Sequence, residues 1–374
     1  MAHAYTPGLR VTAQATIEKQ RRLPLQGEVL VEAGEQVGRD QIVARTQLPG
    51  DVTTLNLVNR LGTTPAELPN YLLKKEGDPI AKGEPLAENK PFIKWFKTIV
   101  ESPIDGTLES ISSITGQLIL RTPPRPVEVN AYVDGTVTQV LPGEGVSIET
   151  HGAFIQGIFG IGGEYGGELI LVSEDPDTVV EAQAIGPECA GRIVVGGSLL
   201  TSQAIARARE VGAVGLIGGG IRDQDLRELL GYDLGVAITG TEDIGLAVIV
   251  TEGFGQIAMA ARTFDILRAC AGRQASVSGA TQIRAGVQRP EIIVPDLENS
   301  PTTQAVQSHE GGLQEGDLLR VIRAPYFGRL GKVSDLPAPL QQVESGVHVR
   351  VLEVEFDDGS RALVPRSNVE LIEE

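Results

Sequence analysis

Short apolar runs separated by glycine recur through the first 140 residues, and this spacing constrains the fold more than any other feature of the chain. Residues 27–31 form one such run, followed by Gly34, Gly38 and a second run at residues 42–44. Runs this short have the length of β-strands, and glycine supplies the backbone conformations that tight turns require. The pattern predicts a series of short strands joined by turns.

Some of these segments resemble one another. Residues 77–88 repeat the spacing of residues 34–44, and residues 133–140 are related to residues 102–111. We interpret them as degenerate repeats, each made of a strand, a glycine turn and a strand. A helix is expected to interrupt the strands over residues 64–73, because a threonine suited to capping precedes a proline at the first helical position.

The repeat sequences GDPIAKGEPLAE and SPIDGTLESI resemble the biotinyl/lipoyl-type barrel-sandwich hybrid, which also occurs in RnfC-type proteins. The resemblance covers about residues 24–140 and implies a small closed β fold. It does not carry over the swinging-arm function, because methionine occurs only at Met1 and Met259 and no Met-Lys-Met motif exists. The nearest match to the lipoyl Asp-Lys-Ala is Asn89-Lys90-Pro91, at a different spacing, and no cofactor is expected.

An aromatic and basic segment lies between these repeats. Phe92, Lys94 and Trp95 are candidate partner-binding residues, because aromatic rings flanked by lysines suit contact with a partner or a membrane surface. The alternative is a hairpin that packs its aromatic rings on its own barrel and leaves the lysines in solvent.

The middle of the chain changes character and predicts alternating strands and helices. Continuous apolar strands that alternate with helices are typical of a largely parallel α/β layer. The expected strands cover residues 192–196, 213–220, 236–239 and 246–250, and the expected helices cover residues 201–211, 223–230 and 256–271.

Loops at strand ends supply the candidate ligand-binding residues of this layer. Gly218, Gly219 and Gly220 follow a predicted strand and precede a predicted helix, an arrangement that can bind an anion. Open α/β sheets also place ligands at polar loops, which adds Glu252, Thr281 and Arg284. The alternatives are tight strand-to-helix packing and ordinary turns, since neither a dinucleotide-binding nor a P-loop pattern is present.

The last 64 residues contain the sequence GDLLRVIRAPYFGRLGKV, which resembles the KOW motif of ribosomal and NusG-type proteins. The resemblance implies an SH3-like barrel that contacts RNA, DNA or protein. Its candidate partner-binding residues are Arg320, Arg323, Tyr326, Phe327, Arg329 and Lys332. The alternative is a barrel that docks on protein, because this segment carries a net charge of −4.

Charge and residue counts narrow the function further. Residues 1–130 carry 15 basic and 15 acidic residues, whereas residues 131–310 carry 10 and 23. An acidic middle offers no general surface for nucleic acid.

The 4 histidines lack metal-ligand spacing, and Cys189 and Cys270 suggest buried apolar positions. No apolar stretch reaches the roughly 18–20 residues of a membrane span, and no signal-type segment is present, so a cytoplasmic protein is expected.

These observations predict a multidomain, β-rich plus α/β protein. We expect a barrel-sandwich hybrid over residues 1–150, a central α/β layered domain over residues 151–300 and an SH3-like KOW barrel over residues 301–374. The function predicted is non-catalytic, a binding or scaffold role through protein–protein contacts, with no metal and with the oligomeric state left open. The alternatives are a ligand-binding or enzymatic α/β core, and a KOW-dependent transcription or translation factor.

Overall fold

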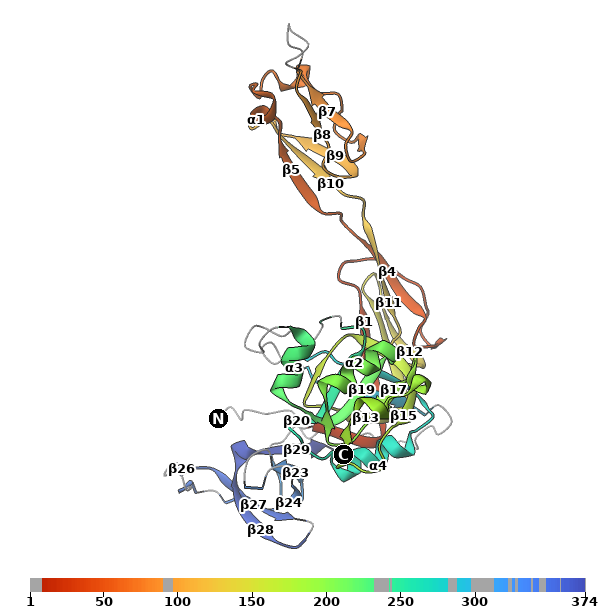
Figure 1. The fold of residues 1–374 in the computed structure, drawn as a ribbon, viewed down its shortest axis with the longest axis vertical. Coiled ribbons are helices and arrows are strands. Elements are labelled where there is room, and N and C mark those ends of the chain that lie inside the picture. Colours follow the sequence, from red (N-terminus) through yellow and green to blue (C-terminus); the bar gives the residue numbers. More distant parts are fainter. Residues whose placement is uncertain are drawn as a thin grey trace.

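The protein is β-rich and contains several sheets, as the computed structural model shows. The structure describes residues 9–89, 97–231, 242, 244–281, 288–296, 313–321, 325–326, 329–337, 339–342, 348–356 and 358–373. Figure 1 shows an elongated molecule, in which a small β module lies at one end and is joined to a larger body through a two-stranded ribbon. The C-terminal strands lie at the opposite end, against the body.

One continuous sheet forms the centre of the molecule. β1 (Leu9–Arg22) pairs antiparallel with β13 (Gly145–Gln156), and β13 also pairs with β12 (Gly135–Leu141) and β22 (Glu291–Pro295). β22 continues through β21 (Gln274–Ser278) to β15 (Glu164–Leu171). The predicted boundary between residues 150 and 151 falls within β13, so the sheet runs across it.

The expected parallel layer is present in the body. β15, β17 (Ile193–Val195), β19 (Gly215–Ile221) and β20 (Ala247–Phe254) pair in parallel in this order. All residues of β17 and β19 are buried, which explains their continuous apolar sequence. The short strands beside them are β14 (Phe159–Ile161), β16 (Val179–Val180) and β18 (Leu199–Leu200).

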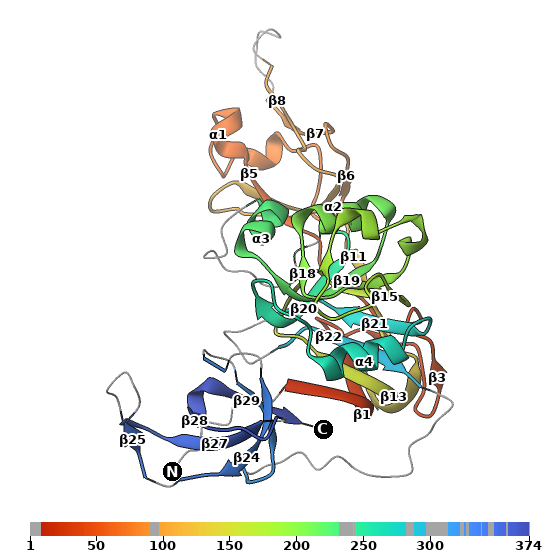
Figure 2. The ribbon, with the colours of Figure 1, turned by 60° about the horizontal axis from the view of Figure 1, so that its bottom comes forward.

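Helices cover both faces of this layer. α2 (Ser202–Val211) and α3 (Asp223–Leu230) pack on one face, and α4 (Ala261–Ala269) packs on the other (Figure 2). The sequence predicted α2 and α3 correctly, and α4 is shorter than its prediction. Thr201 caps α2 by accepting a hydrogen bond from the backbone N–H of Ala204 at 3.1 Å. The strand predicted over residues 236–239 lies outside the described residues.

The helix predicted over residues 64–73 is wrong. The structure instead contains α1 (Leu57–Leu61) and a short 3-10 turn, η1 (Leu68–Asn70). Asn56 caps α1 through a hydrogen bond from Asn59, and Gly62 ends the helix in the left-handed conformation. Pro69 has no N–H to donate, so a regular helix through this position would lose a hydrogen bond. The other 3-10 turns are η3 (Ala182–Ala184), η4 (Pro187–Cys189) and η5 (Arg366–Asn368).

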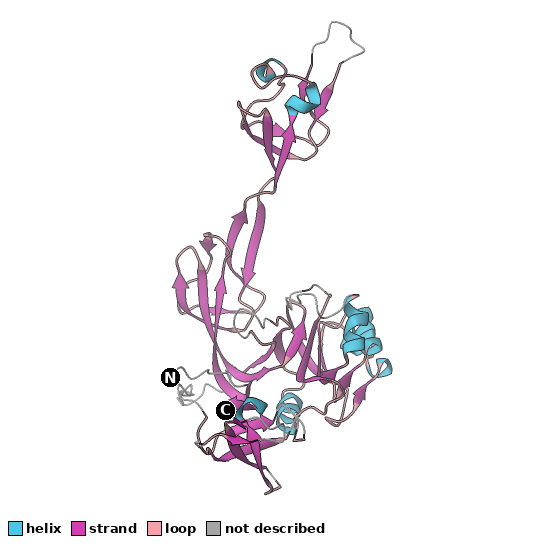
Figure 3. Ribbon diagram, turned by 90° about the vertical axis from the view of Figure 1, so that its left-hand side faces the viewer, coloured by secondary structure: helices cyan, strands magenta, loops and turns pink. Residues whose placement is uncertain are grey.

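Residues 34–44 and 77–88 each contain a strand, a turn and a strand as predicted, whereas residues 102–111 and 133–140 each contain a single strand. Together these segments belong to two nested copies. An outer copy consists of residues 18–45 and 128–149, and an inner copy consists of residues 52–88 and 99–121. The inner copy is inserted between β4 (Ile42–Leu48) and β11 (Arg125–Asn130), the ribbon that projects from the outer copy (Figure 3). The other strands of the two copies are β2 (Glu28–Val29), β3 (Gln36–Val37), β5 (Val52–Asn56), β6 (Pro79–Ile80), β7 (Pro85–Glu88), β8 (Ile99–Glu101), β9 (Gly106–Ile111) and β10 (Gln117–Arg121).

Strand registers establish that the two copies are equivalent. β4 pairs with β11 so that Ala44 faces Val129, and β7 pairs with β8 so that Ala87 faces Val100. Both ladders have a shift in strand register at the equivalent position, directly beside this residue pair. The β9–β10 and β12–β13 ladders match each other in the same way, including their irregularity.

Side-chain hydrogen bonds repeat as well. In the outer copy the Asp134 carboxylate accepts a hydrogen bond from the backbone N–H of Arg39 at 2.8 Å. In the inner copy the Asp105 carboxylate accepts one from the backbone N–H of Lys82, also at 2.8 Å. The same hydrogen-bonded turn therefore occurs in both copies. In each copy the aspartate begins the same sequence, Asp-Gly-Thr.

The C-terminal strands form a separate antiparallel unit, residues 313–373. Its ladder joins β29 (Val369–Glu373) to β23 (Leu318–Val321), then β24 (Leu330–Asp335), β27 (Val351–Phe356) and β28 (Arg361–Pro365). β25 (Gln341–Gln342) and β26 (His348–Val349) form a small hairpin. The first residues of β1 pair in parallel with β29, which connects this unit to the body.

Candidate functional site

The residues singled out in the sequence fall into two groups. Phe92, Lys94, Trp95, Arg284, Arg323 and Phe327 lie outside the described residues. The remainder lie in two parts of the molecule: in the body, on or beside β14, β19 and β20, and in the C-terminal unit.

Glu252 and Arg320 meet between the body and the C-terminal unit. Glu252 lies on β20 and Arg320 on β23, and their side chains form an ion pair while only 5% and 4% exposed. The second carboxylate oxygen of Glu252 accepts a hydrogen bond from the backbone N–H of Ala260 at 3.0 Å. The sequence suggested a ligand for Glu252 and an external partner for Arg320, and the structure brings the two side chains together.

This pair has a consequence for the C-terminal unit. A buried ion pair offsets the cost of desolvating both charges only when the partners stay together. The pair lies where β20 meets β23, and the β1–β29 pairing is a second connection. Among the described residues, the C-terminal unit thus contacts the body both through this ion pair and through backbone pairing of β1 with β29.

Gly218, Gly219 and Gly220 lie within β19, beside the strand that carries Glu252. A Cβ atom on Gly219 would lie 2.2 Å from the carbonyl oxygen of Ile257, and one on Gly220 would lie 2.2 Å from the carbonyl oxygen of Gly255. The backbone N–H of Gly219 donates to the carbonyl of Gly197 at 2.7 Å. The glycines thus permit a close approach of protein backbone to β19.

Thr281 is buried and bonds to the strand beside it. Its hydroxyl oxygen accepts from the backbone N–H of Gly160 at 2.8 Å and lies 3.0 Å from the Gly160 carbonyl oxygen. Both contacts hold β14 in place. The threonine therefore joins its own loop to β14, and its hydroxyl is engaged by backbone groups.

Two of the candidate partner-binding residues of the C-terminal unit, Arg329 and Tyr326, lie against Phe356. The guanidinium of Arg329 lies 3.9 Å from the centre of the Phe356 ring, and the ring of Tyr326 lies 5.3 Å from it. Arg329 also forms a 2.7 Å ion pair with Asp358. Hydrogen bonds from Ser360, followed by the charge of Arg329, lower the pKa of Asp358. Lys332 is exposed on β24.

These contacts change the electrostatic interpretation of the unit. Arg329 lies beside Asp358, and Arg361 forms ion pairs with Glu353 and Glu355 at 3.4 and 2.6 Å. Together with the burial of Arg320, three arginines of the unit are matched by carboxylates. Positive charge available to phosphate groups is correspondingly reduced.

A joint between the outer copy and the body was not predicted from the sequence. The Lys19 ammonium forms a 2.5 Å ion pair with Glu291, and Arg21 bonds both carboxylate oxygens of Glu164 at 2.7 Å. Between them lies the buried Tyr132, whose φ of 72° is unusual for a non-glycine residue. Burial, followed by the nearby carboxylates of Glu291 and Glu164, raises the pKa of Tyr132 well above its ordinary value.

The sequence contained only a weak signal for this joint. Lys19 and Arg21 alternate on one face of a strand, but residues of this kind usually face solvent. Their carboxylate partners lie more than 140 residues away along the chain.

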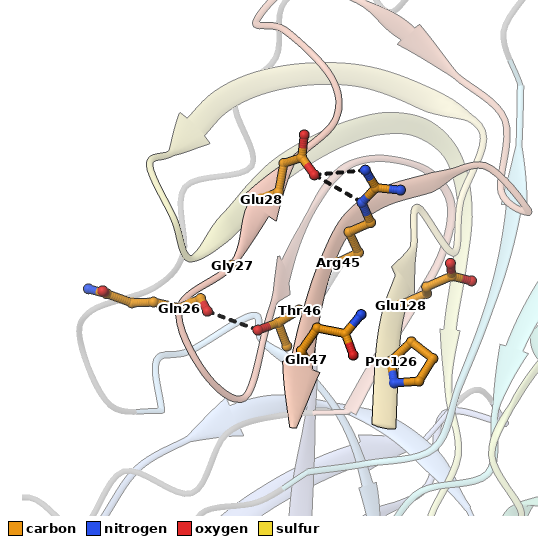
Figure 4. A pocket seen from close by; sticks show the side chains of 8 residues that line it. All are labelled: Gln26, Gly27, Glu28, Arg45, Thr46, Gln47, Pro126 and Glu128. Carbon is orange, nitrogen blue, oxygen red and sulfur yellow. Dashed lines mark hydrogen bonds and ion pairs between the residues drawn. The ribbon is translucent and has the colours of Figure 1, made fainter. Parts of the chain in front are cut away.

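A polar hollow of about 590 Å³ lies at the base of the ribbon (Figure 4). Arg45 lies beside Glu28, with a 2.9 Å ion pair, and faces Glu128 across the β4–β11 ladder. The Thr46 hydroxyl donates to the carbonyl of Gln26 at 2.8 Å. The one arginine in its lining is thus placed between carboxylates, so the hollow does not present free positive charge.

The described part of the chain contains no group of three or more histidine, cysteine or acidic residues placed to hold a metal ion. Cys189 and Cys270 are buried, and burial raises the pKa of both thiols. None of the helices among the described residues has the length and apolar character needed to cross a membrane.

No protein-family model matches the chain. A search of curated proteins likewise found no match.

Proposed function

We propose that the protein is a non-catalytic binding or scaffold protein, which acts through protein–protein contacts made by its projecting inner copy. The observation that carries this proposal is the nested insertion. Among the described residues, the inner copy joins the outer copy through the β4–β11 ribbon, and it lies at the end of the molecule away from the body (Figure 1). A module placed in this way is suited to reach a partner at a distance from the body.

Within this proposal, both copies are barrel-sandwich hybrids of the biotinyl/lipoyl type, and residues 313–373 form an SH3-like KOW barrel. The repeated ladders and the repeated Asp-Gly-Thr turn support the first assignment. The antiparallel order of β23, β24, β27, β28 and β29 supports the second.

The joint at the body supports the scaffold role. Lys19 and Arg21 hold the outer copy through ion pairs with Glu291 and Glu164. The Ser276 hydroxyl donates to the carbonyl of Tyr132 at 2.5 Å, and the Arg39 guanidinium donates to Gln274 at 3.0 Å. Several side-chain contacts at one junction favour a fixed orientation of the outer copy.

The alternatives gain less support from the described contacts. An enzymatic or ligand-binding core would use Glu252 and Thr281, which bond to Arg320 and Gly160. A KOW-dependent contact with nucleic acid would use Arg320 and Arg329, which lie against carboxylates.

A variant that lacks the inner copy, called the armless variant below, tests the proposal. Residues 46–127 are replaced by residues 89–98, because the latter connect Glu88 to Ile99, the pair equivalent to Arg45 and Glu128. The transplanted segment carries Phe92→Ser, Lys94→Ser and Trp95→Ser, since these are candidate partner-binding residues. The full chain and the armless variant are used in parallel to capture proteins from the native lysate. We expect a stoichiometric partner that only the full chain retains. No partner, or one that binds both chains equally, contradicts the proposal.

A further inference from the structure

The outer and inner copies can be compared strand by strand, and they differ at one sheet edge. β5 of the inner copy is equivalent to residues 18–22 of β1, since both pair in the same register with the equivalent strands β10 and β13. Within the described residues, β5 pairs with β10 alone and is the last strand of its sheet. An edge strand of this kind leaves backbone N–H and C=O groups free to pair with another strand.

The register identifies which backbone groups face outward. Thr122 donates to the carbonyl of Asp51 at 3.0 Å, and Leu57 donates to the carbonyl of Gly116 at 3.2 Å. Bonding alternates along an antiparallel pair, so the odd-numbered residues of β5 face β10. The N–H and C=O groups of Val52 and Thr54 therefore point to the open edge.

The equivalent edges differ in charge. Residues 18–22 read Glu-Lys-Gln-Arg-Arg, whereas β5 reads Val-Thr-Thr-Leu-Asn. Charged side chains along an edge are a common means of preventing unwanted strand pairing. The outer copy has that protection, and the inner copy has β-branched, uncharged residues, of which Val52 is 50% exposed.

We propose that β5 pairs antiparallel with β5 of a second copy of this chain, so that two inner copies share one sheet across a two-fold axis. The axis passes beside Thr54, which places two threonines opposite each other, a favourable cross-strand pair. No like charges meet, because the strand has no charged residue.

A second copy is the occupant that the charge distribution favours. The protein has a net charge of −17, yet residues 1–130 carry equal numbers of basic and acidic residues. The inner copy lies at the end of the molecule furthest from the C-terminal unit (Figures 1 and 2). Contact there keeps the acidic bodies apart, so repulsion between two copies is least at this edge.

The test is the mass of the full chain in solution, measured by sedimentation equilibrium over a range of protein concentrations. We expect the mass to rise from 39.7 kDa towards twice that value as concentration increases. Thr54→Pro removes an outward N–H that β10 does not use, and proline is tolerated at such edge positions. This variant should stay at the mass of one chain, with an unchanged circular dichroism spectrum.

Two further variants keep the test decisive. Thr54→Lys places a charge at the edge without changing the backbone, and it should also abolish the dimer. Gln20→Lys is the matched control at the equivalent position of the outer copy and should leave the dimer intact. A wild-type protein that remains a single chain at every concentration overturns the pairing, as does a dimer that survives both Thr54 variants. Such a result would leave the proposed scaffold function untouched, because that function requires a different protein as partner.

Discussion

Removing Arg320 should weaken the contact between the C-terminal unit and the body. Arg320→Met retains a long side chain but leaves the Glu252 carboxylate, only 5% exposed, without its guanidinium. Breaking a buried pair from one side costs about 3–5 kcal/mol, because an uncompensated charge remains in a medium of low polarity. We expect a loss of this size in the stability of the contact between β20 and β23.

A double variant distinguishes the cost of leaving Glu252 unpaired from the loss of the other contacts of the two side chains. Adding Glu252→Leu to Arg320→Met removes the stranded charge, so most of the loss should be recovered. The remaining loss should be about 1 kcal/mol, the usual worth of the hydrogen bond from Ala260 to Glu252. Arg361→Met is the matched control, because its ion pair with Glu355 is about half exposed and such pairs contribute about 0–1 kcal/mol.

Native-state hydrogen exchange is the assay, since unfolding of a protein with several units is not two-state. The opening free energy of the amides in β23 and β29 should fall by about 3–5 kcal/mol in Arg320→Met, and by less than about 1 kcal/mol in Arg361→Met. A loss below about 1 kcal/mol in Arg320→Met refutes the reasoning, as does a double variant whose loss equals the sum of the two single losses.

Three further predictions follow from individual contacts. Gly219→Ala should lower the opening free energy of the β19 amides by about 1–3 kcal/mol in native-state hydrogen exchange, whereas Gly163→Ala, with no atom within 4 Å of its Cβ position, should be near neutral. The pKa of Asp358 is lowered in the folded protein, so its contribution is present above the unfolded pKa of about 4 and is lost as the pH falls through the folded value. Circular dichroism melts should therefore show an acid-dependent loss that Asp358→Asn reduces, and an equal loss in both proteins would contradict this. Cys189 and Cys270 should react with a thiol reagent only after unfolding, and rapid labelling of the native protein would show that they are accessible.

Local features of the fold were predictable from the sequence. The threonine cap and the terminal glycine of α2 are local signals, and so are the glycine turns of the repeats, because each depends on a few adjacent residues. The helix predicted over residues 64–73 also depended on local signals and was wrong, because Pro69 cannot donate a helical hydrogen bond and the chain forms only a 3-10 turn there.

Long-range features were not predictable. The β4–β11 ladder joins Arg45 to Glu128 across the whole inner copy, and no local pattern specifies that pairing. The Glu252–Arg320 pair links positions 68 residues apart, and charged residues are ordinarily expected at the surface. The candidate residues were therefore placed on separate sites, although two of them bond to each other.

The nesting of one copy within the other is tested most directly by excising the inner copy. The armless chain, in which residues 89–98 replace residues 46–127, should fold with the outer copy and body unchanged. Hydrogen exchange should then give the amides of β12, β13 and β22 the same protection as in the full chain. Loss of that protection, or failure of the shortened chain to fold, would contradict the equivalence of the two copies.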